Sequence, residues 1–91
     1  MSGPVTRVVR ITNRRGLHAR ASAKFVTLAT QQPATVEVEK DGARVAGTSI
    51  MGLMMLGAAM GDSVTISAEG QGAEAAVTCL AELVEAKFGE D

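Results

Sequence analysis

The segment Asn13-Arg14-Arg15-Gly16-Leu17-His18-Ala19-Arg20-Ala21-Ser22-Ala23-Lys24 joins a predicted strand to a predicted helix and holds the only histidine of the chain. Before it, residues 5–12 alternate in the manner of a strand. After it, apolar residues recur at helical spacing and predict a helix over residues 19–31, which Pro33 ends. His18 therefore stands at or beside the helix N-cap, next to backbone N–H groups that have no intrahelical acceptor.

The remaining chain continues the alternation of strands and helices. It predicts strands over residues 35–39, 44–46 and 62–69, a short helix between Ser49 and Gly57, and a last helix over residues 73–88. Asp41-Gly42 is typical of a tight hairpin between two of these strands. The order is β-α-β-β-α-β-α within one domain, residues 1–91. Since the strands have one polar face, the helices must cover the other face and form a two-layer sandwich.

Composition excludes several classes of function. The 91 residues are 46% hydrophobic and 21% charged, which indicates one folded domain. A net charge of −1 and only two aromatic residues argue against nucleic-acid binding. One cysteine, Cys79, and one histidine leave no metal site and no internal disulfide. We expect no cofactor.

The apolar segments also bear on location. The N-terminal residues contain no apolar region of a signal peptide, and the most apolar window, residues 50–60, is too short to span a bilayer. We therefore expect a cytoplasmic protein without membrane insertion.

Residues 48–57 form a second unusual stretch. Ser49 is a good N-cap and Gly57 a good residue to follow a helix end, yet the helix between them is apolar nearly all round. We expect Ile50, Leu53 and Leu56 to reach the core. Met51 and Met54 then face outward or lie on a rim, although ordinary core positions remain open for both.

The residues around His18 suit the acceptance of a phosphoryl group. An imidazole nucleophile, free amides at a helix N-terminus and nearby guanidinium groups favour a phosphate there. Arg20 pairs with phosphoryl oxygens, and the amides of Ala19 and Arg20 are the nearest backbone donors. Arg14 and Arg15 are interpreted as turn residues that favour solubility, and contact of either one with the phosphate or a partner remains open. The acidic residues Glu90 and Asp91 are expected to face solvent.

Asn-x-x-Gly-Leu-His-Ala-Arg, followed by a helix that contains Phe25, resembles the phosphorylation signature of HPr. HPr is the phosphocarrier of the bacterial phosphoenolpyruvate-dependent phosphotransferase system. Ser49-Ile50-Met51-Gly52-Leu53-Met54 resembles the family's regulatory serine and the helix after it. The resemblance covers essentially the whole chain. It implies an α+β, open-faced sandwich whose antiparallel sheet has the order 1-4-2-3, with three helices on one face.

The resemblance also implies roles. His18 would take a phosphoryl group from enzyme I on Nδ1 and pass it to a histidine of an enzyme IIA domain, with Arg20 assisting. Ser49 would be the site of HPr kinase/phosphorylase where that enzyme exists. The protein would be a relay rather than an enzyme, and a monomer. The expected docking residues lie around His18: Ala23, Lys24, Thr27, Ile50, Met51 and Met54.

Two features separate the chain from the common pattern. Ala21 stands where the family usually has proline directly after the active-site arginine. The run from Leu53 to Gly57 resembles members of the nitrogen-related branch, which leaves sugar transport open. The alternative function is a regulatory interaction module, in which partner proteins read the phosphorylation state at His18 or Ser49.

Overall fold

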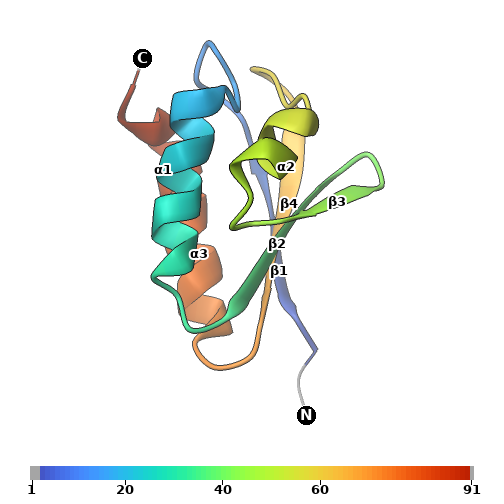
Figure 1. The fold of residues 1–91 in the computed structure, drawn as a ribbon, viewed down its shortest axis with the longest axis vertical. Helices are drawn as coiled ribbons and strands as arrows, with labels where there is room; N and C mark the ends of the chain where they lie inside the picture. Colours follow the sequence, from blue (N-terminus) through green and yellow to red (C-terminus); the bar gives the residue numbers. More distant parts are fainter. Residues whose placement is uncertain (1–2, 91) are drawn as a thin grey trace.

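The computed structural model describes residues 3–90, which form the predicted order of elements (Figure 1). The elements are β1 (Val5–Arg10), α1 (Ala19–Thr30), β2 (Thr35–Lys40), β3 (Ala43–Ala46), α2 (Ile50–Met55), β4 (Ser63–Glu69), α3 (Ala73–Glu85) and the 3₁₀ turn η1 (Lys87–Gly89). No helix among these residues is long and apolar enough to cross a membrane.

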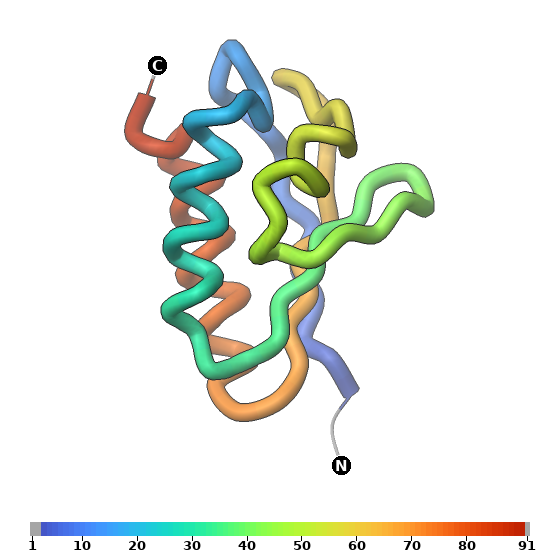
Figure 2. Tube along the Cα trace, in the orientation of Figure 1, coloured from blue at the N-terminus to red at the C-terminus, as the bar shows by residue number. Residues whose placement is uncertain are grey.

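The sheet is antiparallel throughout and has the strand order β1-β4-β2-β3. This confirms the α+β fold and the 1-4-2-3 order that the resemblance implied. The two long helices α1 and α3 lie side by side against the sheet, and α2 packs beside α1 (Figures 1 and 2). Figure 2 also shows that the C-terminal turn lies beside the start of α1.

The core lies between the helices and the alternate residues of the strands. On β4, for example, Val64, Ile66 and Ala68 are buried, whereas the residues between them are more exposed. Phe25 of α1 and Phe88 after α3 are the largest fully buried side chains. The opposite face of the sheet is open, and Val8 of β1 is 66% exposed there.

The hairpin between β2 and β3 has the predicted tight turn. Asp41 and Gly42 both have positive φ angles, 50° and 85°, as the two central residues of a type I′ turn do. Strand boundaries differ from the predicted ones by one or two residues, as expected at frayed ends.

The last helix ends earlier than predicted, at Glu85 rather than at residue 88. The chain then turns through three successive residues with positive φ: Lys87, Phe88 and Gly89. Periodicity could not reveal this turn, because Phe88 follows Val84 by four residues and so extends the apolar stripe of a longer helix.

The prediction that Ile50 reaches the core is wrong. Leu53 and Leu56 are buried as expected, but Ile50 is 40% exposed. A helical side chain lies over the turn that precedes its own Cα. Since α2 begins at Ile50, no preceding turn carries this side chain to the core.

Candidate functional site

The loop that carries His18 is held by a close approach to the segment after α2. Gly16 has a φ of +64°, and a Cβ atom on it would lie 2.3 Å from the carbonyl oxygen of Ala58. Only glycine fits such a contact. Leu17 donates its N–H to the same carbonyl at 3.0 Å. The start of α1 is therefore fixed against a neighbouring backbone.

His18 is the N-cap residue of α1, as the sequence predicted. Its backbone is extended, and its carbonyl accepts the N–H of Ser22 at 2.9 Å. The ring nitrogen Nδ1 accepts the backbone N–H of Arg20 at 3.2 Å. The side chain is 14% exposed. One ring nitrogen thus faces the positive end of the helix dipole.

The other ring nitrogen contacts Glu90. His18 Nε2 lies 3.0 Å from both carboxylate oxygens of Glu90, and the buried amide of Asn13 donates to Oε1 at 2.7 Å. The prediction that Glu90 faces solvent is therefore wrong, while Asp91 lies outside the described residues. Hydrogen bonds from Asn13 and then His18, together with the positive charge of Arg15, lower the pKa of Glu90. No local sequence pattern predicts the contacts of Glu90, because Glu90, Asn13 and His18 come together only in the folded chain.

The contacts of the ring define its tautomer. The pKa of Glu90 is lowered, and an ionised carboxylate is an acceptor only, so Nε2 carries the hydrogen. Nδ1 faces an N–H donor, so Nδ1 carries a lone pair. An imidazolium would place a second N–H against the Arg20 amide. The geometry therefore fits the neutral Nε2–H form, in which Nδ1 is the nucleophilic nitrogen.

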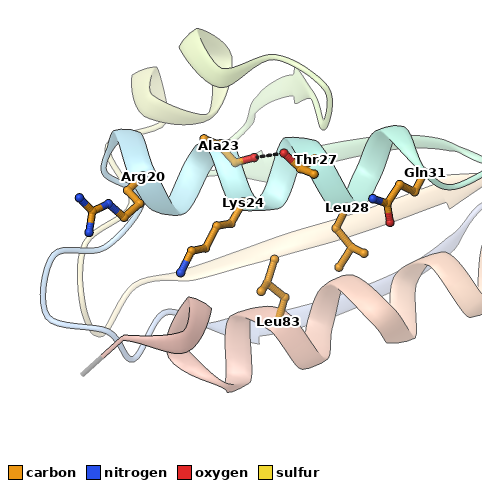
Figure 3. Close-up of a pocket in the computed structure, with 7 residues that line it drawn as sticks. All are labelled: Arg20, Ala23, Lys24, Thr27, Leu28, Gln31 and Leu83. Carbon is orange, nitrogen blue, oxygen red and sulfur yellow. Dashed lines mark hydrogen bonds between the residues drawn. The ribbon is translucent and has the colours of Figure 1, made fainter.

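The amides of Ala19 and Arg20, the predicted phosphate donors, belong to the first turn of α1, and that of Arg20 contacts Nδ1. Ala19, Arg20 and Ala21 occupy the first three helix positions, so their N–H groups have no intrahelical acceptor. Ala21 is fully buried and keeps the N–H that a proline would lack. Among residues 3–90 the Arg20 guanidinium makes no hydrogen bond or ion pair, and it extends outward from α1 (Figure 3).

Lys24 takes part in a contact that the sequence did not predict. Its Nζ donates to the backbone carbonyl of Phe88 at 2.7 Å, and Figure 3 shows the side chain pointing toward the C-terminal turn. A shallow groove of about 400 Å³ runs between α1 and α3 beside it (Figure 3). Its lining consists of Arg20, Ala23, Lys24, Thr27, Leu28, Gln31 and Leu83.

The second predicted site region lies on α2. Ser49 is its N-cap, and Ser49 Oγ accepts the N–H of Gly52 at 2.9 Å. Met51 and Met54 are 71% and 42% exposed, as expected for outward positions. The sequence interpretation missed Met55 and Met60, which are 80% and 58% exposed. Ile50, Met51, Met54, Met55 and Met60 are the exposed apolar residues of this region, called the methionine patch below.

Comparison with known proteins gives consistent results. The family model described as "PTS HPr component phosphorylation site" matches residues 5–86. The phosphocarrier protein HPr of Neisseria meningitidis is 45% identical over 90% of this chain and 92% of its own length. The phosphocarrier protein NPr of Shewanella violacea is 39% identical over 92% of each chain. The crystal structure of HPr-C-His from Thermoanaerobacter tengcongensis has a TM-score of 0.88, with 44% identity over 99% of each chain.

The fold, the capping histidine and these matches define a histidine phosphocarrier domain. The chain belongs to the HPr family of the phosphotransferase system. Its activity is that of a phosphoryl relay rather than of a catalyst. Relatives named HPr and NPr match it at similar identity.

Proposed function

We propose that His18 accepts a phosphoryl group from phosphorylated enzyme I on Nδ1 and passes it to a histidine of an enzyme IIA domain. The observation that carries the proposal is the lone pair of Nδ1 at the N-terminus of α1, 3.2 Å from the Arg20 amide. This nitrogen combines a nucleophile with a donor that stabilises an anion. Enzyme I and the enzyme IIA domain would dock in turn on the exposed surface around His18. We propose that the protein acts as a monomer in the cytoplasm.

The transfer uses groups that are already in place. The Nδ1 lone pair attacks phosphorus while the bond from phosphorus to the donor histidine breaks. The Arg20 backbone N–H donates to Nδ1 in the free protein. After transfer it donates to a phosphoryl oxygen. The unpaired Arg20 guanidinium supplies a planar pair of donors for the oxygens in the transition state.

The test is incubation with phosphoenolpyruvate and enzyme I, followed by mass spectrometry. We expect an acid-labile increment of one phosphate on the wild-type protein and none on His18→Ala. Arg20→Lys keeps the charge but loses the planar pair of donors, so it should slow the reaction about tenfold. Phosphate on His18→Ala, or none on the wild type, would refute the relay at this residue.

We also propose Ser49 as a regulatory phosphorylation site for HPr kinase/phosphorylase. The supporting observation is its place beside the methionine patch. There a phosphate adds up to two negative charges next to a docking surface. Ser49→Asp should therefore slow phosphorylation of His18 by enzyme I. The matched control is Ser63→Asp on the exposed start of β4, which should leave the rate unchanged.

The second candidate function is a regulatory interaction module. The methionine patch favours it, because flexible thioether side chains adapt to several protein surfaces. A pull-down with His18→Ala and Ser49→Asp tests it. Different partner sets for the two variants support a switch that is read by its phosphorylation state, and identical sets count against it.

A further inference from the structure

The segment Lys87–Glu90, here called the C-terminal strap, has an unusual backbone. Lys87 and Phe88 have φ angles of 59° and 56°, a region that L side chains rarely adopt. Gly89 follows with a φ of 77°. Strained residues of this kind persist where the surroundings hold them, and they cluster at functional sites.

Three contacts hold the strap against the start of α1. Phe88 is 1% exposed and joins the core. Lys24 donates to the Phe88 carbonyl at 2.7 Å. Asn13 is fully buried, and its Nδ2 donates both to the Gly16 carbonyl at 2.8 Å and to Glu90 at 2.7 Å. Together these three contacts place the Glu90 carboxylate against Nε2 of His18.

The orientation of Asn13 is fixed by these partners. Both groups that face Nδ2 are acceptors, so the amide cannot be turned over. Asn13 Oδ1 is left buried without a hydrogen-bond partner among the described residues. Such an unmet acceptor is costly. The loop thus keeps an unfavourable arrangement that presents its amide donor to Glu90.

We infer that Glu90 is a positioning residue for phosphoryl transfer, which holds His18 in the Nε2–H form and stabilises the positive charge that the ring gains on attack. The inference rests on the proposed function, since it concerns the same histidine. Glu90 does not touch the phosphoryl group. It acts through the imidazole, on the side opposite to Nδ1.

The step balances without an added proton carrier. Nδ1 forms its bond to phosphorus as the donor's bond to phosphorus breaks, and the Nε2 hydrogen stays where it is. The product ring is an N-phosphorylated imidazolium, whose Nε2–H donates to the Glu90 carboxylate. On transfer to the next histidine, the electron pair of the N–P bond returns to Nδ1. Glu90 thus stabilises the phosphorylated ring in its labile protonated form.

The first measurement is the tautomer of His18, read from the ¹⁵N shifts of the ring. The chain has one histidine, so the spectrum holds one imidazole. Spectra are recorded at about pH 8.5, well above the ordinary imidazole pKa of about 6.5, and we expect the Nε2–H form to predominate in the wild type. Glu90→Gln presents an amide whose N–H₂ competes for Nε2, so the Nδ1–H population should rise. Glu85→Gln, which loses an exposed carboxylate paired with Arg7, should match the wild type.

The second measurement is the rate of phosphorylation by phosphorylated enzyme I. Glu90→Gln should be about tenfold slower, the change expected from losing one hydrogen bond to a charged group. Glu90→Asp, which keeps the charge on a shorter side chain, should recover part of both the rate and the tautomer ratio. It also serves as the test should Glu90→Gln fail to fold.

The outcomes separate this inference from the proposed function. A wild-type tautomer ratio or an unchanged rate in Glu90→Gln overturns the role of Glu90, even if His18 is phosphorylated. An equal loss in Glu85→Gln overturns it as well. Absence of phosphorylation in the wild type overturns the relay itself. The tautomer comparison needs no partner protein and still tests the contact of Glu90 with the ring.

Discussion

Asn13 and Glu90 are 77 positions apart, and the side-chain amide of the first donates a 2.7 Å hydrogen bond to the carboxylate of the second. Through this bond the loop before α1 and the strap after α3 meet at His18. Glu90 accepts a hydrogen bond from Asn13 and also contacts His18. Substitutions in the loop before α1 or in the strap should therefore both alter the position of the His18 ring.

Gly16→Ala tests the close approach of the loop to Ala58. The new Cβ would lie 2.3 Å from the Ala58 carbonyl oxygen at a positive φ. We expect a loss of about 2–3 kcal/mol in the free energy of unfolding in urea. Gly42→Ala is the matched control, since its φ is also positive but nothing lies within 4 Å. It should cost about 1 kcal/mol. Equal losses would show that the contact with Ala58 is unimportant.

Lys87→Gly tests the strain of the strap. Lys87 has a φ of 59° and an exposed side chain, so glycine should relieve the backbone and raise the free energy of unfolding by about 0.5–1 kcal/mol. Glu82→Gly, on the exposed face of α3, should instead lower it by about 1 kcal/mol. A destabilised Lys87→Gly variant would mean that the left-handed turn carries no strain.

Lys24→Met tests the hydrogen bond that fastens the strap to α1. Without the bond from Nζ to the Phe88 carbonyl, the strap should open more often. Amide exchange of Glu90, whose N–H donates to the Lys87 carbonyl at 2.9 Å, should then be faster. Lys40→Met removes an ammonium from the distant hairpin and should leave this exchange rate unchanged. Similar exchange in both variants would contradict the anchor.

The pH dependence of stability follows from the lowered pKa of Glu90. The folded protein binds this proton less readily than the unfolded chain does, so protonation favours unfolding. The contribution of Glu90 is therefore full at neutral pH and is lost as the pH falls through its folded pKa. Urea unfolding of wild type and Glu90→Gln at about pH 7 and about pH 3 checks this. We expect the wild type to be more stable at the higher pH and the difference to shrink at the lower. A constant difference would refute it.

Met51→Glu tests the methionine patch as a docking surface. Met51 is 71% exposed, so the substitution should change stability by less than about 0.5 kcal/mol. A charge in the patch should nevertheless weaken binding of enzyme I, measured by calorimetry. Val8→Glu is the matched control, because Val8 is also exposed but lies on the open face of the sheet. Equal affinities for the two variants would place docking elsewhere.

Much of the fold was predictable because local patterns decide it. The alternation of β4, the Asp41-Gly42 turn and the Ser49 cap each depend on a few neighbouring residues, and each was confirmed. His18 as N-cap was predictable for the same reason. Hydrophobic periodicity and turn chemistry are short-range signals.

The errors arose where distant segments meet. Phe88 continues the spacing of α3 whether the chain stays helical or turns, so only packing decides between the two. Glu90 looks like an ordinary terminal charge until Asn13 and His18 are seen beside it. Ile50 is exposed because α2 begins at this residue, so no preceding helical turn carries its side chain to the core. Long-range pairing and element ends are the parts that local patterns leave open.

The position of Glu90 has a practical consequence for preparing this protein. We expect an affinity tag or fusion partner at the C-terminal end to disturb the strap, which holds Glu90 against Asn13 and His18. The start of β1 lies at the opposite end of the molecule (Figure 1). We therefore expect a tag placed before β1 to leave the histidine undisturbed, and assays of transfer rates should use such material.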